Sequence, residues 1–238
     1  EHDQVQGVVF TGSTNAGKKV AKIAGKNLKK TVLELGGNDP YLILEDADID
    51  NAIKACIEGR LLNCGQSCIS AKRLIVTKNN IESFTKGLIK ELNLKIMGDP
   101  LGYVDYGPLV SSSARDEVHK MVKSSMKMGA KLDLGGEIPD SDGAYYPITV
   151  LSKVLPGMPA FEEEIFGPIF SIIEAKDNDH AIDLANNSKY GLGAAIFTSD
   201  INEGRKIAEE KIQAGVCFVN DYVKSDPRLP FGGVKMSG

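Results

Sequence analysis

Near its start the chain passes through VVFTGSTNAG at residues 8–17, and this stretch decides how the fold is interpreted. Its apolar half, residues 8–11, predicts a buried parallel strand, and the small residues that follow predict a tight turn. Residues 18–28 then carry apolar side chains at helical spacing. A strand, a glycine-bearing turn and a helix form half of a nucleotide-binding βαβ unit, in which helix amides face an anion. Because the glycines do not follow GxGxxG, a purely structural turn stays an open alternative.

The same alternation of strands and helices continues to the end of the chain. Strands are expected at 31–35, 41–44, 71–77, 131–134, 169–175, 193–198 and 215–220, with an extended segment at 146–154. Further helices are expected after Asp48 (carrying 49–57) and at 79–95, 112–128, 179–187 and 202–213. Pro147 favours a sheet edge for the extended segment, because proline cannot donate to a strand ladder. Short loops between alternating strands and helices predict an α/β fold with a mainly parallel sheet.

The composition is that of an ordinary globular protein. The 238 residues are 42% hydrophobic and 25% charged, and the chain is long enough for one large domain or two smaller ones. A net charge of −4 and a pI near 5.5 argue against nucleic acid or an anionic membrane as partner. The sequence has no apolar run of membrane-spanning length and no secretion-like start. We therefore expect a cytoplasmic protein without membrane or nucleic-acid partners.

The four cysteines indicate neither a disulfide framework nor a metal centre. Cys56, Cys64, Cys68 and Cys217 lack the regular spacing of a disulfide scaffold. No second Cys or His pair accompanies Cys64 and Cys68, and a structural zinc site needs four clustered ligands, so we expect no metal. Cys56 falls in an apolar helical stripe and is predicted to be a core residue, and a packing role is favoured for Cys64.

Cys68 is the candidate nucleophile. It lies in NCGQSCIS at residues 63–70, where small and polar neighbours predict a turn rather than a core. A thiol attacks a carbonyl carbon as the thiolate, and its ordinary pKa leaves it mostly protonated near neutral pH. The reaction therefore needs an activating environment or a nearby base. The candidate base is Glu34, in LELGGN at residues 33–38.

A second unusual stretch is PAFEEEIFGP at residues 159–168, which places three carboxylates beside two aromatic rings between prolines. A run of charges is normally a solvated face, and that interpretation is kept for Glu162 and Glu163. The solvated-face interpretation does not extend to Glu164, so a functional role is considered for this third carboxylate.

Four motifs in order resemble those of the NAD(P)-dependent aldehyde dehydrogenase superfamily: LELGG at 33–37, GQSC at 65–68, EIFGP at 164–168 and PFGGVKMSG at 230–238. The resemblance covers essentially the whole chain. It implies an aldehyde dehydrogenase-like catalytic domain with a mainly parallel sheet at residues 35–238. It also implies that residues 1–34 are the last part of a Rossmann-type cofactor domain, and that the protein forms homo-oligomers, either dimers or tetramers.

The resemblance also implies the roles of the two candidate catalytic residues. Cys68 matches the catalytic thiol, which attacks an aldehyde to give a thiohemiacetal, and hydride transfer to the nicotinamide then leaves a thioester. Its backbone N–H would help to hold the oxyanion. Glu34 matches the general base that activates water for hydrolysis of the thioester, and 68 − 34 = 34 residues separate the two. A carboxylate whose pKa is raised by an apolar cleft suits that task.

Other residues match positions that contact the cofactor, NAD or NADP. Gly12, Ser13 and Gly17 match a GSTxxG segment, Glu164 matches the carboxylate that binds the nicotinamide ribose, and Phe166 matches the aromatic residue beside the nicotinamide. Each of them also has a purely structural interpretation, because a motif needs its geometric context before a role is established.

Part of the family's machinery lies outside this sequence. The first half of the Rossmann domain, a cofactor-binding lysine and an asparagine of the oxyanion hole all precede the GSTxxG segment in this family. Loss of one such donor commonly costs about a hundredfold to a thousandfold in rate. We therefore expect a fragment of a protein about twice as long, weak or inactive alone. The alternatives are a non-catalytic truncated paralogue that only folds and oligomerises, and a thiol hydrolase that needs no cofactor.

The substrate interpretation follows the subfamily resemblance, which is strongest to bacterial succinate-semialdehyde dehydrogenases. A semialdehyde carboxylate needs a basic or polar clamp, for which Ser225 and Arg228 are candidates. Leu62 lies six positions before the nucleophile, where some members of the subfamily carry an arginine. That departure leaves the identity of the aldehyde open.

Overall fold

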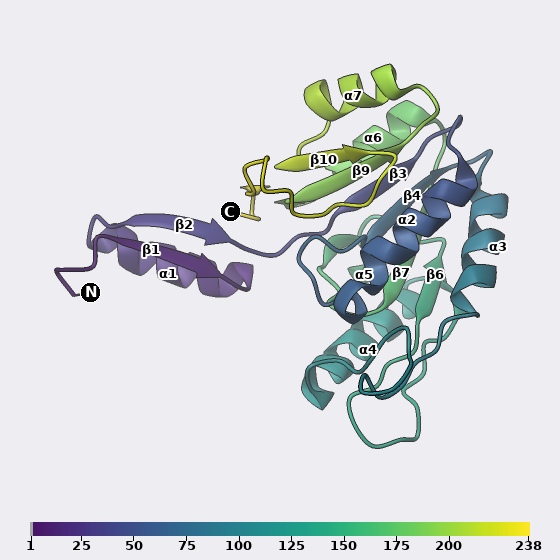
Figure 1. Ribbon diagram of the computed structural model, residues 1–238, viewed down its shortest axis with the longest axis horizontal. Helices are drawn as coiled ribbons and strands as arrows, with labels where there is room; N and C mark the ends of the chain where they lie inside the picture. Colours follow the sequence, from purple (N-terminus) through teal and green to yellow (C-terminus); the bar gives the residue numbers. More distant parts are fainter. Residues whose placement is uncertain (1) are drawn as a thin grey trace.

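The structure is a computed structural model that describes residues 2–238 (Figure 1). Its strands are β1 (Gly7–Thr11), β2 (Lys30–Glu34), β3 (Pro40–Ile43), β4 (Arg73–Thr77), β5 (Lys131–Leu134), β6 (Thr149–Ser152), β7 (Ile169–Ala175), β8 (Tyr190–Gly191), β9 (Gly193–Phe197), β10 (Val216–Val219) and β11 (Val234–Lys235). Its helices are α1 (Thr14–Lys26), α2 (Ile49–Leu61), α3 (Ile81–Leu92), α4 (Ser112–Lys127), α5 (Pro159–Glu162), α6 (Asn178–Asn186) and α7 (Ile201–Glu210), with a 3₁₀ helix η1 (Leu62–Gly65).

A seven-stranded sheet forms the centre of the molecule, in the order β10-β9-β3-β4-β7-β6-β5. Every neighbouring pair in it is parallel except β5 and β6, which are antiparallel. The α/β fold with a mainly parallel sheet is therefore confirmed.

The two central strands explain why this sheet is stable. All residues of β3 and β4 are buried, as expected for parallel strands covered on both faces. Helix α2 packs on β3, α3 packs on β4, and α6 packs on β3, β4 and β7. The helix predicted after Asp48 begins there, because the Asp48 side chain accepts the amide of Asn51 at 3.1 Å. Cys56, on this helix, is fully buried as predicted.

The prediction of an edge position for residues 146–154 was wrong. Only Thr149–Ser152 form a strand, and β6 lies inside the sheet between β7 and β5. Pro147 precedes the strand, so its missing N–H removes no ladder bond. The edge is instead formed by β5.

Strands β1 and β2 form a separate parallel pair, which α1 accompanies; we call residues 7–34 the N-terminal unit. Figure 1 shows this unit projecting from one side of the seven-stranded body. Helix α1 begins four residues earlier than expected, at Thr14 instead of 18, because Ser13 caps it by accepting the Ala16 amide at 3.3 Å. The division into domains at residues 34 and 35 stays a prediction.

The last residues of the chain return to the N-terminal unit. The carbonyl of Ser237 accepts the amide of Leu35 at 2.8 Å, and Thr14 Oγ1 donates to the carbonyl of Met236 at 3.2 Å. Ser237 Oγ also accepts the amide of Gly191 in the body at 3.0 Å. The C-terminal segment therefore joins the two parts. Among residues 2–238, no helix has both the length and the apolar character that crossing a bilayer requires.

Candidate active site

A cleft of about 560 Å³ lies between the N-terminal unit and the body. Six residues singled out from the sequence line it together: Gly12, Ser13, Glu34, Cys68, Glu164 and Phe166. They come from the turn after β1, the end of β2, the turn after η1 and the segment before β7. The fold thus gathers the proposed nucleophile, the proposed base and most of the proposed cofactor contacts at one place.

The turn that carries Cys68 has an unusual backbone. Asn63, Cys64 and Gly65 follow one another with φ angles of 51°, 57° and 74°. Such left-handed conformations cost energy for residues other than glycine and are common at functional sites. A Cβ on Gly65 would lie 2.2 Å from the carbonyl oxygen of Gly167, so only glycine fits there. The turn is therefore pressed against the segment that leads into β7.

Side-chain hydrogen bonds hold the same turn. Asn63 Nδ2 donates to the carbonyl of Gln66 at 2.9 Å, and Gln66 Nε2 donates back to the carbonyl of Asn63 at 3.1 Å. Gln66 Oε1 also accepts the amide of Val110 at 2.8 Å. This explains the polar residues around the nucleophile: they give hydrogen-bond partners to the carbonyl of Gln66 and the amide of Val110, which lie outside the helices and strands. Cys64 is buried in this turn, consistent with the packing role that we predicted.

The Cys68 thiol is partly buried. Burial raises its pKa above the ordinary value for cysteine, and the nearby positive charge of Lys72 acts in the opposite direction. The thiol is therefore mostly protonated near neutral pH, and a base has to remove its proton before it attacks.

Glu34 has the properties of such a base. It is the last residue of β2, and its atom Oε2 is buried without a hydrogen-bond partner among the residues that the structure describes. Burial raises the pKa of this carboxyl. A buried carboxylate oxygen without a partner is free to accept a proton from water or from the thiol.

Two adjacent glycines, Gly36 and Gly37, allow Glu164 and the backbone of Cys68 to approach the same short segment. A Cβ on Gly36 would lie 2.3 Å from Glu164 Oε2, and a Cβ on Gly37 would lie 2.6 Å from the carbonyl oxygen of Cys68. The amide of Gly37 donates to Glu164 Oε1 at 3.0 Å. The GG pair is therefore required because Glu164 and the nucleophile's backbone both approach it closely.

The glycines of the GSTxxG segment have different positions. Gly12 lines the cleft, whereas Gly17 lies outside its lining and is buried in α1. A Cβ on Gly17 would lie 2.4 Å from Leu35 Cδ2, which indicates a role in packing the helix. Ser13 caps α1, and the first turn of α1 contains no acidic residue. This helix start therefore fits an anionic cofactor group, which free amides attract and acidic side chains would repel.

The two candidates for substrate binding are not among the residues that line the cleft. Ser225 is exposed, and the Arg228 side chain is 85% exposed and pairs with Asp226, with Nε 2.9 Å from Oδ1. Leu62 is also exposed. A role for Ser225 and Arg228 stays a proposal.

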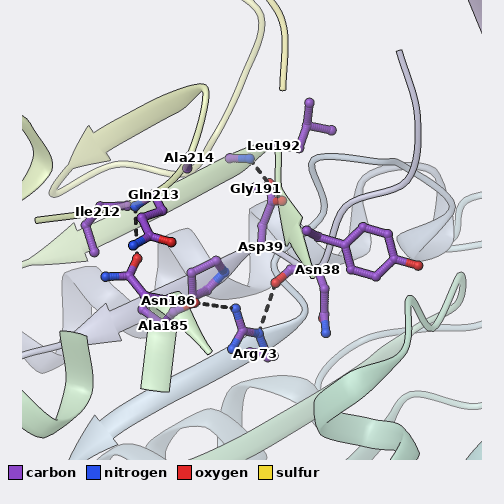
Figure 2. Close-up of a pocket in the computed structure, with 13 residues that line it drawn as sticks. Asn38, Asp39, Arg73, Ala185, Asn186, Gly191, Leu192, Ile212, Gln213 and Ala214 are labelled. Carbon is purple, nitrogen blue, oxygen red and sulfur yellow. Dashed lines mark hydrogen bonds between the residues drawn. The ribbon is translucent and has the colours of Figure 1, made fainter. Parts of the chain in front are cut away.

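Sequence reasoning missed two buried charges beside the site. Asp39 Oδ1 accepts the Gly193 amide at 3.0 Å, and burial raises the pKa of this carboxyl to about 7. Lys72 lies against the turn of Cys68. Figure 2 shows Asp39 at an interior pocket with Asn38 and Arg73. In the sequence, Lys72 and Arg73 directly precede the apolar residues 74–76; buried charges at such a position need partners, but the sequence does not identify those partners.

The sequence model of the Aldehyde dehydrogenase family matches residues 1–238 of this chain. The chain belongs to this family. A relative within it, "Succinate semialdehyde dehydrogenase [NAD(P)+] Sad" of Escherichia coli, is 45% identical over 236 residues, which cover 99% of this chain and 51% of that protein. "Succinate-semialdehyde dehydrogenase [NADP(+)]" of Deinococcus radiodurans is 43% identical over 238 residues, which cover 100% of this chain and 50% of that protein.

One solved structure is similar in fold to this chain over its whole length. The succinic semialdehyde dehydrogenase of Streptococcus pyogenes, in complex with NADP+, has a TM-score of 0.96 and 40% identity. The similarity covers 100% of this chain and 52% of the solved one. The chain therefore spans about half the length of the relatives it matches.

Proposed function

We propose that the whole protein oxidises an aldehyde to a carboxylate with NAD or NADP, using Cys68 as nucleophile and Glu34 as base. The observation that carries this proposal is the shared cleft: Cys68, Glu34, Glu164 and Ser13 line one space although they come from distant parts of the sequence. The names of the relatives, which are NAD(P)- or NADP-dependent succinate-semialdehyde dehydrogenases, support the same reaction class.

The residues of the cleft fit a nicotinamide dinucleotide. Ser13 and the start of α1 would hold an anionic group, and Glu164, which also lines the cleft, would accept hydrogen bonds from ribose hydroxyls. Phe166 is 42% exposed, which leaves a ring face for a flat heterocycle. When bound, the nicotinamide supplies the acceptor for the hydride that leaves the substrate carbon.

The chain's own residues carry the remaining chemistry. Glu34 takes the proton of the Cys68 thiol and passes it to the solvent; the thiolate then forms a bond to the aldehyde carbon, and the carbonyl electron pair moves onto oxygen. The Cys68 backbone N–H stabilises that oxyanion. When that carbon has lost its hydride, the substrate is bound to Cys68 as a thioester. Glu34 then takes a proton from water, the water oxygen attacks the thioester carbon, and the Cys68 thiolate leaves; the carboxylic acid so formed loses its second proton to the solvent and is released as the carboxylate.

We propose succinic semialdehyde as the substrate, following the names of the relatives. Its carboxylate would need a donor, and Ser225 and Arg228 are the residues that we propose for it. The ion pair of Arg228 with Asp226 would have to open for a substrate carboxylate to be bound. We further propose that the whole protein acts as a dimer or tetramer in the cytoplasm.

The test is formation of NAD(P)H from succinic semialdehyde by the whole protein and by this 238-residue chain. We expect turnover by the whole protein, and weak or no turnover by this chain alone. Cys68→Ser should remove at least about a thousandfold of the activity and Glu34→Gln about a hundredfold. Turnover by the whole protein that survives Cys68→Ser would overturn the mechanism. A whole protein that turns over no aldehyde and binds neither NAD nor NADP would favour the non-catalytic alternative.

A further inference from the structure

Lys72 is a buried cation that belongs to none of the four sequence motifs. Its side chain is 2% exposed. Its Nζ lies 3.0 Å from the carbonyl oxygen of Ser67, 2.7 Å from the carbonyl oxygen of Cys68 and 3.4 Å from Glu164 Oε1. The ammonium therefore donates two hydrogen bonds to backbone carbonyls and forms a salt bridge with Glu164.

The partners of Lys72 distinguish it from an ordinary structural cation. Its two hydrogen-bond acceptors belong to the turn of Cys68, and its salt-bridge partner is a carboxylate that lines the same cleft. The adjacent Arg73 is buried as well, but it donates to the carbonyls of Asn38, Leu184 and Ala185, none of which lines the cleft. The two neighbouring cations thus have separate tasks.

The backbone beside Lys72 is rigid. Its amide donates to the Asp39 carbonyl at 3.2 Å, and β4, which starts at the next residue, is buried between β3 and β7. A site residue held by a central strand is positioned more accurately than one on a loop. The Cys68 turn, by contrast, contains strained residues and needs an external support to keep one conformation.

We propose that Lys72 is a positioning residue, which fixes the Cys68 turn on the central sheet and joins it to Glu164, so that the nucleophile and the carboxylate of the cofactor site are held as one unit. This inference rests on the proposed roles of Cys68 and Glu164.

The charges around the thiol make the proposal testable without turnover. The charged groups that face Cys68 are Lys72, Asp39 and Glu164, and Lys72 itself also faces Arg60. Removal of the ammonium leaves the thiol facing two carboxyl groups. The thiolate is then less stable, and the pKa of Cys68 rises.

The experiment measures alkylation of Cys68 by iodoacetamide against pH in the 238-residue chain, with labelled sites separated by tandem mass spectrometry. Lys72→Met keeps the apolar stem and removes the charge. We expect the pKa of Cys68 to rise by about one unit, so that alkylation slows about tenfold below that pKa. Lys72→Arg keeps a cation and should restore the rate to within about threefold of the original.

Two matched controls separate positioning from stability. Arg73→Met removes the neighbouring buried cation, and Lys78→Met removes an exposed cation at the other end of β4. Neither should move the pH profile of Cys68, although Arg73→Met should lower the melting temperature. A folded Lys72→Met chain with an unchanged profile would overturn the proposal, as would an equal shift in Arg73→Met.

If Lys72→Met does not fold, Glu164→Gln tests the same connection from the cleft side. The amide still accepts the Gly37 N–H, while the negative charge that faces Lys72 and Cys68 is lost. We expect alkylation of Cys68 to become about threefold faster below its pKa. An unchanged rate would contradict the coupling. Because alkylation needs no aldehyde and no cofactor, a whole protein that oxidises no aldehyde would refute the proposed function and leave this result standing.

Discussion

The seven-stranded body and the N-terminal unit differ in how they bury their strands. In the body, Val76 on β4 is fully buried, whereas Val9 on β1 and Val32 on β2 are 75% and 56% exposed. The body therefore has its own core, and the N-terminal unit does not cover its sheet with the described residues. Since Cys68 belongs to the body and Glu34 ends β2, the candidate site depends on a stable part and a weakly packed part at once.

The largest contrast is expected between two glycine substitutions. Gly65→Ala places a Cβ 2.2 Å from the Gly167 carbonyl at a φ of +74°, so it should lower the free energy of unfolding by about 3 kcal/mol. Gly25→Ala in α1 meets nothing within 4 Å and should stabilise the helix by about 0.5–1 kcal/mol. Urea unfolding followed by circular dichroism measures both. Equal destabilisation by the two changes would contradict the comparison.

Truncation of valine on each sheet should give a smaller contrast. Val76→Ala removes fully buried methyl groups and should cost about 2 kcal/mol. Val9→Ala removes exposed ones and should change the free energy of unfolding by less than about 0.5 kcal/mol. The same urea titration tests this pair, and a cost above about 1 kcal/mol for Val9→Ala would show that β1 is covered in solution.

The buried Asp39 should make the stability of the body depend on pH. Burial raises the pKa of its carboxyl to about 7 in the folded chain, above the ordinary value of 3.8. The contribution of Asp39 to the free energy of unfolding is therefore largest below about pH 4. It decreases as the pH rises from 4 through 7, by up to about 1.4 kcal/mol per pH unit. Asp39→Asn should flatten this slope in urea titrations between pH 4 and 7. A slope that persists in the variant would assign it to other groups.

The smallest effect is expected from helix caps. Ser13→Ala removes the cap of α1 and Asp48→Ala the cap of α2, each at a cost of about 1 kcal/mol to its helix. In the body, Asp48→Ala should lower the global free energy of unfolding by that amount. In the N-terminal unit, Ser13→Ala should instead speed amide exchange in α1 and leave exchange in β4 unchanged. Uniform faster exchange in both regions would show that the two parts unfold together.

Periodicity predicted most of the fold because its signals are local. Residues 169–175 were predicted as a strand and form β7 with the same bounds. The start of α1 was missed because Ser13 was taken for part of a turn, although it is also a good cap. The position of β6 was missed because the order of strands in a sheet depends on contacts between distant residues, which Pro147 alone does not reveal.

The sequence predicted those residues of the candidate site that belong to recognisable motifs. Cys68, Glu34 and Glu164 were singled out by resemblance, and the structure brings them to one cleft. Lys72 was missed because its partners are two backbone carbonyls and a carboxylate 92 positions away (164 − 72), none of which leaves a pattern in the sequence. The packing task of Gly17 was missed for the same reason, since only the fold places Leu35 beside it.

The return of the C-terminal segment to the N-terminal unit has a consequence for the order of folding. The contact between Thr14 and Met236 joins residues 222 positions apart. Such a contact closes a very long loop, and contacts of this kind form late because their entropy cost precedes their gain. The amide of Leu35, directly after β2, therefore gains its partner Ser237 only when a segment of 202 residues (237 − 35) has folded back. We therefore expect the position of Glu34, the residue before Leu35, to be fixed only after this long loop has closed.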